Sequence, residues 1–321
     1  MDRRLAVFFS LLAISLHLLP LPGDASTFTI TNNCDYTVWP GILSNAGVAP
    51  LSTTGFSLQK GESKPIALPS GWGGRFWGRT LCSTDKKTGQ FTCLTGDCGS
   101  GKIECSGAGA LPPATLAEFT LDGSGGMDFY DVSLVDGYNV AMLVAPRGGS
   151  GPNCTFTGCV NDLNGACPSE LRVMSEGEES AVACKSACGK FNSPQYCCSG
   201  TYGSPDTCKP SSYSLAFKKA CPRAYSYAYD DKSSTFTCKG SPDYTITFCP
   251  SPTTSQKASD EEGTPSTSSP SSNVIMNSSM VYEGALDMSS SPSTYNHVLC
   301  SPLIAGGVAT IIAIWRLSQL F

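Results

Sequence analysis

Alternation between apolar and polar residues is the main pattern in the central part of this 321-residue chain. Residues 27–31 alternate near one end of that part, and residues 244–248 alternate near the other. Residues 36–39 are rich in β-branched and aromatic side chains. Such stretches predict strands, whereas helical periodicity is confined to residues 178–188 and 214–220. With 33 glycines and 22 prolines available for turns, the pattern predicts a mainly β fold, either a sandwich or a barrel.

Residues 1–25 have the pattern of a secretory signal peptide. Two arginines precede an apolar run at residues 5–21, and small residues follow up to Ala25. This order predicts cleavage after Ala25 and export of the remaining chain. A short transmembrane helix is the alternative, but two prolines interrupt the end of the run.

Two further segments follow the central part. Residues 251–297 are dominated by Ser, Thr and Pro, which predicts a disordered stalk. The apolar residues 298–321 resemble a glycolipid (GPI) anchor signal with Ser289 as the candidate attachment site; a retained transmembrane helix and an unprocessed soluble tail are the alternatives. Either of the first two interpretations makes the plasma membrane a partner of this tail. N-glycosylation sequons occur at Asn277 in the stalk and at Asn153 in the central part.

The numbers of cysteines and histidines limit the possible chemistry. Sixteen of the 17 cysteines lie between Cys34 and Cys249, an even number that predicts eight disulfides in an oxidising compartment. Both histidines, His17 and His297, lie in the terminal segments. Nucleophiles activated by histidine and zinc bound by histidine are therefore excluded from the central part. We expect no metal and no cofactor, so any catalysis has to use carboxylates.

The charge pattern argues against nucleic acid as a partner. The formal net charge is −5, and Lys and Arg occur singly rather than in a basic patch. A neutral or cationic partner fits this balance better than an anionic one. The acidic residues Glu176, Glu178 and Glu179 form a cluster that we expect to be solvated rather than to bind calcium.

A compact motif of cysteines and glycines occupies residues 89–105. It reads Gly-Gln-Phe-Thr-Cys-Leu-Thr-Gly-Asp-Cys at residues 89–98 and continues to Gly101 and Cys105. This motif resembles the signature of the thaumatin-like proteins, a pathogenesis-related plant family. Further agreement is found in Asn-Asn-Cys at 32–34, Trp-Gly-Arg-Thr at 77–80, Thr-Leu-Ala-Glu at 115–118, Tyr-Cys-Cys at 196–198 and Cys-Pro-Arg-Ala-Tyr-Ser-Tyr at 221–227.

The resemblance covers residues 26–250 and implies an architecture. This is a thaumatin-like antiparallel β-sandwich (residues 26–79, 114–160 and 222–250) with a small disulfide loop lobe (80–113) and a disulfide-rich helical lobe (161–221). The implied disulfides are Cys34–Cys249, Cys82–Cys93, Cys98–Cys105, Cys154–Cys238, Cys159–Cys221, Cys167–Cys184, Cys188–Cys197 and Cys198–Cys208. A longer loop at residues 199–207 and the acidic charge resemble the larger, non-sweet branch of the family. We expect a monomer.

The family also carries an acidic cleft between its sandwich and its helical lobe. The cleft is lined by one arginine, one glutamate and three aspartates. Transferred residue by residue, these are Arg75, Glu118, Asp131, Asp136 and Asp231, each in a matching sequence context. The resemblance therefore implies an intact cleft in this chain.

Clustered carboxylates beside an arginine allow two kinds of function. They can accept hydrogen bonds from sugar hydroxyls, with rings such as Phe129 or Tyr138 nearby for stacking. Alternatively, like charges raise the pKa of one carboxyl while the arginine keeps another ionised, as glycosidases require. Glu118 is then the candidate general acid and Asp131 its partner. A carboxyl separation of about 5 Å predicts retention of configuration, and about 6.5–9.5 Å predicts inversion.

Together, the resemblance and the cleft predict a defence-type protein that binds β-1,3-glucan or a related wall polysaccharide and has antifungal activity. A weak endo-β-1,3-glucanase is the alternative, and a proteinaceous glycosidase inhibitor is a third possibility. We expect the protein in the cell wall or, GPI-anchored, at the outer face of the plasma membrane. Structural roles are assigned to Arg79, in a buried ion pair, and to Trp39 and Trp77, in the core.

Overall fold

The computed structural model describes residues 25–175, 177 and 180–251. The predicted signal peptide up to residue 24, the stalk and the apolar tail lie outside this range, together with Asn277, Ser289 and the three clustered glutamates. None of the described helices is long and apolar enough to cross a membrane.

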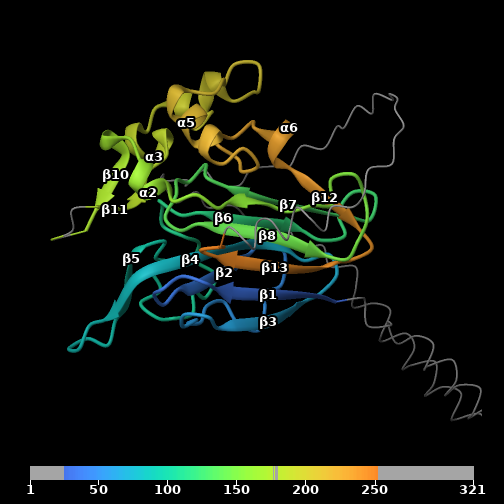
Figure 1. The fold of residues 1–321 in the computed structure, drawn as a ribbon, viewed down its shortest axis with the longest axis horizontal. Coiled ribbons are helices and arrows are strands. Elements are labelled where there is room, and N and C mark those ends of the chain that lie inside the picture. The colour runs from blue at the N-terminus through green and yellow to red at the C-terminus, as the bar shows by residue number, and fades with distance from the viewer. Residues whose placement is uncertain (1–24, 176, 178–179, 252–321) are drawn as a thin grey trace, which may run out of the picture. The chain divides into compact units, whose positions relative to one another are not determined.

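Two β-sheets form the body of the described fold (Figure 1). The first has the strand order β3 (Ser63–Leu68), β1 (Ser26–Asn32), β13 (Asp243–Phe248), β8 (Met142–Arg147), β9 (Thr157–Cys159). The second has the order β12 (Phe236–Lys239), β7 (Met127–Ser133), β6 (Leu116–Thr120), β4 (Gly73–Thr84), β2 (Trp39–Ser44), and β5 (Phe91–Thr95) pairs with β4. Most pairs are antiparallel, which agrees with the mainly β fold predicted from the sequence.

The first and last strands pair with each other in parallel. β1 and β13 are in register from Phe28, opposite Tyr244, to Asn32, opposite Phe248. Both were predicted as strands from alternation, but alternation carries no information about which strands pair. Just beyond this pair, a disulfide joins Cys34 to Cys249 across 215 residues of sequence. Closing so long a loop stabilises a fold by about 5 kcal/mol in the chain-entropy model.

Side chains from both sheets meet in one apolar core. Phe119 of the second sheet contacts Phe28 and Tyr244 of the first, with ring centroids 4.6 Å and 5.2 Å apart. All three are buried, and burying one large apolar side chain stabilises a fold by about 1.5–3 kcal/mol. Because successive side chains of a strand point to opposite faces, Glu118 points away from this core.

The segment between β9 and β12 carries the helices, which lie on the β6–β7 side of the second sheet in Figure 1. Its elements are α2 (Leu163–Ala166), η1 (Ser169–Leu171), β10 (Arg172–Met174), β11 (Ala181–Cys184), α3 (Ala187–Phe191), α4 (Pro194–Cys197), η2 (Gly200–Tyr202), α5 (Ser212–Ala220) and α6 (Asp231–Ser234). α5 begins at a capping box in which Ser211 and Ser214 satisfy each other's backbone N–H groups. The helix predicted at residues 214–220 is confirmed.

The helix predicted at residues 178–188 is wrong over most of its described part. Residues 181–184 form the strand β11, and α3 begins only at Ala187. Cys184 exchanges two backbone hydrogen bonds of 2.8 Å with Tyr138 and forms a disulfide with Cys167. These tertiary contacts override a local helical pattern whose intrinsic preference is weak.

Eight disulfides cross-link the described fold. They join the pairs that the family resemblance implies, Cys34–Cys249, Cys82–Cys93, Cys98–Cys105, Cys154–Cys238, Cys159–Cys221, Cys167–Cys184, Cys188–Cys197 and Cys198–Cys208. Cys188–Cys197 ties α3 to α4, and Cys198–Cys208 closes the loop that follows α4. The helical segment is therefore cross-linked internally, and its buried residues Leu163, Leu171 and Phe217 belong to the same core as the sheets.

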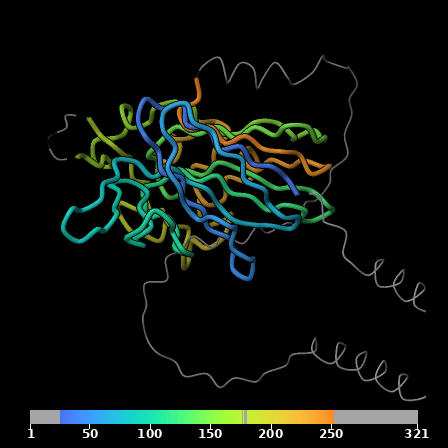
Figure 2. Tube along the Cα trace, turned by 90° about the horizontal axis from the view of Figure 1, so that it is seen from below, coloured from blue at the N-terminus to red at the C-terminus, as the bar shows by residue number. Residues whose placement is uncertain are grey.

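The cysteine-rich loop that contains β5 projects from one end of the strands (Figures 1 and 2). Trp77 is fully buried where this loop meets β4, and its indole Nε1 donates to the carbonyl of Gly96 at 2.8 Å. Trp39 is only partly buried. The predicted core position is thus confirmed for Trp77 and holds only in part for Trp39.

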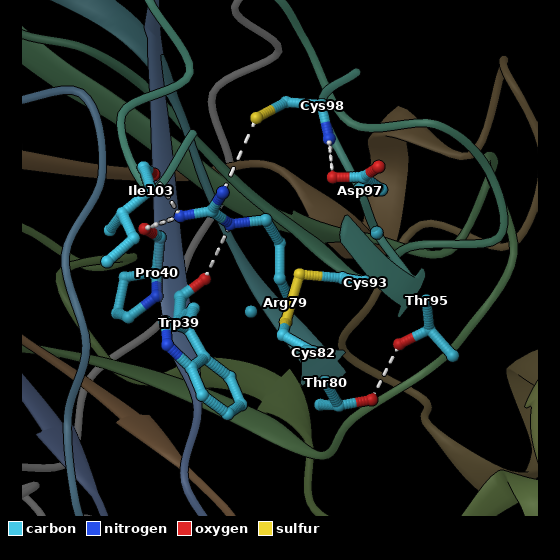
Figure 3. Close-up of a disulfide and its surroundings, with 12 residues drawn as sticks. Trp39, Pro40, Arg79, Thr80, Cys82, Cys93, Thr95, Asp97, Cys98 and Ile103 are labelled. Atoms are coloured by element: carbon cyan, nitrogen blue, oxygen red, sulfur yellow. Dashed lines mark hydrogen bonds between the residues drawn. A yellow bond between two sulfur atoms is a disulfide. The ribbon is translucent and has the colours of Figure 1, made fainter. Parts of the chain in front are cut away.

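Arg79 is fully buried, but the ion pair expected from the sequence is not how its charge is satisfied. Its guanidinium donates to the carbonyls of Trp39 (2.9 Å), Pro40 (3.2 Å) and Ile103 (2.6 Å) and contacts Cys98 Sγ at 3.5 Å (Figure 3). Burial lowers the pKa of Arg79 to about 10, and nearby carboxylates oppose this shift. Carbonyl dipoles take the place of a carboxylate, and Arg79 joins β2 to the cysteine-rich loop.

Candidate functional site

Three of the five candidate residues stand in one row across neighbouring strands. Arg75 on β4 is opposite Glu118 on β6, and Glu118 is opposite Asp131 on β7. Cβ atoms of directly opposed residues lie about 4.5–5.5 Å apart. Their chain neighbours Phe76 and Val132 are in the core, so the row lies on the outer face of the sheet.

Arg75 and Glu118 form a loose ion pair. Arg75 Nε lies 3.8 Å from Glu118 Oε1, and the two side chains are 16% and 21% exposed. This distance is too long for a hydrogen bond, and Nε of Arg75 is buried without a hydrogen-bond partner in the described structure. Arg75 therefore keeps a donor for a further acceptor.

Asp131 is the most deeply buried carboxyl of the row, with 2% of the residue exposed. Within the described residues, its Oδ1 has no hydrogen-bond partner. Burial raises the pKa of Asp131 well above its usual range, the charges of Glu118 and Asp231 raise it further, and Arg75 opposes them. Asp131 therefore retains a proton at a pH where an exposed aspartate is ionised.

Burial also raises the pKa of Glu118, against the effect of Arg75 and with help from Asp136. Two neighbouring carboxyls with raised pKa values hold one proton between them before both ionise. Glu118 lies beside the positive charge of Arg75, whereas Asp131 is the more deeply buried carboxyl and its Oδ1 has no hydrogen-bond partner in the described structure, so this geometry favours Asp131 as the proton carrier. Glu118 is the general acid expected from the sequence, and the geometry favours the reverse assignment.

Hydrogen bonds of Tyr225 connect Asp231 to the row. The Tyr225 hydroxyl donates to Asp231 Oδ1 at 2.9 Å and also contacts the Thr235 hydroxyl. The backbone N–H of Tyr225 donates to the carbonyl of Val132, directly beside Asp131. Asp231, at the start of α6, is thereby placed where its charge acts on Asp131.

The neighbouring acid Asp230 has a different role. Its Oδ2 accepts hydrogen bonds from the backbone and the hydroxyl of Ser226 and forms an ion pair of 2.9 Å with Lys218. These partners hold the turn before α6. Asp230 is structural, whereas the side chain of Asp231 is left exposed.

Asp136 follows β7 in a turn whose backbone is tied to Ala114 by a hydrogen bond of 3.2 Å. Its side chain is partly buried, and its charge contributes to the raised pKa of Glu118. Asp136 thus acts on Glu118, as Asp231 acts on Asp131. The structure brings Arg75, Glu118, Asp131, Asp136 and Asp231 into one electrostatic group, which we call the acidic cluster.

The two aromatic rings expected to stack on a sugar are not accessible. Phe129 is 7% exposed and Tyr138 is 1% exposed. The Tyr138 hydroxyl also donates a hydrogen bond of 3.0 Å to the carbonyl of Asn161. The tyrosines that do lie near the acidic cluster are Tyr225 and Tyr227, and burial together with nearby aspartates raises the pKa of both. Both belong to the motif at residues 221–227, which the sequence analysis used for recognition only.

Within the described ranges, no three His, Cys, Asp or Glu side chains form a group that could hold a metal ion. The exposed Asn153 lies in the loop before Cys154, which is bonded to Cys238.

Comparison with known proteins identifies the family. The Thaumatin family model matches residues 32–250. Thaumatin-like protein 1 of Arabidopsis thaliana is 60% identical over 76% of this chain and 94% of that protein. Pathogenesis-related thaumatin-like protein 3.5 of Cryptomeria japonica is 57% identical over 71% of this chain and 92% of that protein. A Prunus avium protein named glucan endo-1,3-beta-glucosidase is 53% identical over 74% of this chain and 97% of that protein. The chain therefore belongs to the thaumatin family.

Proposed function

We propose that this chain binds β-1,3-glucan or a related cell-wall polysaccharide at the acidic cluster. The observation that carries the proposal is Oδ1 of Asp131, a buried acceptor without a partner in the described structure, in a row with Glu118 and Arg75. A buried polar atom left without a partner costs about 1–3 kcal/mol. We propose that the ligand approaches from the side of Arg75 and Glu118, whose side chains are 16% and 21% exposed, and that a small movement of these side chains lets a ligand hydroxyl donate to the buried oxygen and remove that penalty.

Mixed protonation of the carboxyls suits a ligand rich in hydroxyls. A protonated carboxyl donates a hydrogen bond, an ionised one accepts, and a sugar hydroxyl does both. Arg75 Nε adds a donor. The raised pKa values of Glu118 and Asp131 also lower the negative charge of the acidic cluster, so a neutral polymer is a suitable partner.

The name of the Prunus avium relative, glucan endo-1,3-beta-glucosidase, supports β-1,3-glucan as the polymer. Because this polymer class occurs in fungal walls as well as plant walls, we propose an antifungal, defence-type role. We further propose that the chain is exported and lies in the cell wall or at the outer face of the plasma membrane, in the second case attached through a GPI anchor for which residues 298–321 are the signal.

The test is binding of the full chain to insoluble β-1,3-glucan. Glu118→Gln and Asp131→Asn should each weaken binding several-fold. Each replaces a titratable carboxyl by an amide, so the pair can no longer share one proton between two carboxyls. Asp206→Asn, which removes one negative charge from an exposed position of the helical segment, is the matched control. Equal binding by all four proteins would refute the assignment to the acidic cluster, and absence of binding by the wild type would refute the proposal.

Hydrolysis of the same polymer is the second candidate function. The observation in its favour is the pair of directly opposed carboxyls, both with a raised pKa, in which Glu118 lies beside Arg75 and Asp131 is the more deeply buried. This arrangement favours a proton on Asp131 and a negative charge on Glu118. This is the division between acid and base that glycosidases use. Release of reducing ends by the wild type but not by Glu118→Gln would establish it, whereas equal background release by both would exclude it.

A further inference from the structure

A groove opens on the helical segment next to the acidic cluster. Three tyrosines, Tyr196, Tyr213 and Tyr227, line it together with polar side chains that include Gln195 and Lys209. They come from α4, from α5, from the turn before α6 and, for Lys209, from the position directly after the disulfide Cys198–Cys208. We call this surface the tyrosine groove.

Aromatic side chains form one wall of the tyrosine groove. The rings of Tyr196 and Tyr213 have centroids 6.1 Å apart and are nearly perpendicular, and Phe191 packs against both at 5.5 Å and 5.4 Å. Phe191 is nevertheless 41% exposed. The Tyr213 hydroxyl donates to Glu170 at 3.0 Å, and the disulfide Cys188–Cys197 holds α3 and α4 together. Rings fixed in this way lose little conformational entropy when a ligand binds.

Several hydrogen-bonding groups of the groove are unused. In the part of the chain that the structure describes, no hydrogen bond engages the hydroxyls of Tyr196 and Tyr227 or the side-chain amide of Gln195. By contrast, Lys209 Nζ donates to the carbonyl of Pro205 at 2.8 Å. Apolar ring faces bordered by free donors and acceptors match a pyranose ring, which has an apolar C–H face and hydroxyls around its edge.

The tyrosine groove is continuous with the acidic cluster. Tyr225 contacts Asp231 in the cluster, and Tyr227 lines the groove two residues later, so their Cα atoms lie at most about 7 Å apart. Burial and the charges of Asp230 and Asp231 raise the pKa of Tyr227, which agrees with a position close to the acidic cluster. On the other side, Val135 lines the groove directly before Asp136 of the cluster.

We infer that the tyrosine groove is a second carbohydrate subsite, which holds further pyranose units of a β-1,3-glucan chain whose other units occupy the acidic cluster. The inference rests on the proposed function and extends it, because it assigns the preference for long over short oligosaccharides to Tyr196, Tyr213 and Tyr227. A trisaccharide engages the acidic cluster alone, and a heptasaccharide engages both surfaces.

The experiment is calorimetric titration of the full chain with β-1,3-linked glucose oligosaccharides of three and seven units. Tyr196→Ala should weaken binding of the heptasaccharide about tenfold, equivalent to about 1.4 kcal/mol, and leave trisaccharide binding unchanged. Tyr227→Phe removes one hydroxyl without disturbing packing and should weaken only the heptasaccharide, by about threefold. Tyr202→Ala is the matched control, since Tyr202 is exposed in the same segment but does not line the groove.

The outcomes separate the two proposals. If the wild type binds neither oligosaccharide, both the proposed function and this inference fail. If it binds both and neither Tyr196→Ala nor Tyr227→Phe alters the heptasaccharide affinity, the subsite is refuted while the proposed function stands. An equal loss for both oligosaccharides in Tyr227→Phe would place this tyrosine in the acidic cluster and also refute a separate subsite.

Discussion

Glu118 and Asp131 stand directly opposite each other on β6 and β7, and burial raises the pKa of both carboxyls. Burial disfavours both ionisations of such a pair, and the second is the more difficult because it places two negative charges side by side. Arg75 lies on the Glu118 side of the pair and fixes where the first charge resides. The pair is therefore sensitive to pH, to charge substitution and to ligands that donate hydrogen bonds.

Asp131→Asn should stabilise the protein at neutral pH. The raised pKa means that the folded protein binds this proton more tightly than the unfolded chain. The contribution of Asp131 to the free energy of unfolding is thus complete below the unfolded pKa of about 3.9 and is lost as pH rises through the folded pKa. Between these two pKa values, the free energy of unfolding falls by up to about 1.4 kcal/mol for each pH unit. Guanidinium unfolding of the wild type and the variant between pH 4 and 8 measures this difference in the free energy of unfolding. A stability difference that does not grow with pH would contradict the assignment.

Asp230→Asn should mainly lower stability, whereas Asp231→Asn should mainly weaken glucan binding. Asp230→Asn weakens the ion pair with Lys218 and the bonds to Ser226, so it should lower the free energy of unfolding by about 1.5–3 kcal/mol. Asp231→Asn should change stability by less than about 0.5 kcal/mol, since this side chain is exposed, but weaken glucan binding several-fold. Thermal unfolding measures the stability of both variants, and glucan pull-down measures their binding. If Asp231→Asn proves the less stable protein, Asp231 is the structural acid and Asp230 is not.

Arg79→Met should destabilise the protein by about 3 kcal/mol or more, because it removes the donor of three hydrogen bonds, to one buried and two partly buried carbonyl groups. Arg79→Lys keeps the charge and part of the hydrogen bonding, so its stability should fall between those of Arg79→Met and the wild type. Guanidinium unfolding measures the free energy of unfolding of both variants. Glucan binding per folded molecule should stay unchanged, and a loss of binding without a loss of stability would show that Arg79 serves the ligand.

Treatment of membranes with phosphatidylinositol-specific phospholipase should release the protein if residues 298–321 are an anchor signal. A Ser289→Leu variant should reduce surface attachment if Ser289 is the attachment site. A protein that stays with the membrane after the enzyme has acted on a control GPI protein would favour a retained helix instead. Recovery in the medium without treatment would refute both forms of attachment.

Much of the fold was predictable because its strands alternate clearly. β1 and β13 follow the polar and apolar pattern of residues 27–31 and 244–248, and α5 follows a helical one. The stretch at residues 178–188 was misjudged because disulfide and backbone contacts to Cys184 outweigh its local preference. No local pattern reports such distant contacts.

The acidic cluster was predictable only through family resemblance, since its residues are widely separated in sequence. Strand register then adds what the sequence lacks: Arg75, Glu118 and Asp131 are direct neighbours, which sets the order of their proton affinities. Phe129 and Tyr138 show the opposite error. Closeness to an acid in sequence suggests a ligand contact for these aromatic residues, but both rings are buried.

The disulfide between Cys34 and Cys249 has a mechanical consequence. It lies immediately after β13 and two residues after β1, at the same end of two strands that run in parallel. Tension applied to the chain beyond Cys249 passes through the sulfur bridge into both strands at once. Neither strand can be peeled from the sheet alone, so the domain should resist pulling from this side as one unit.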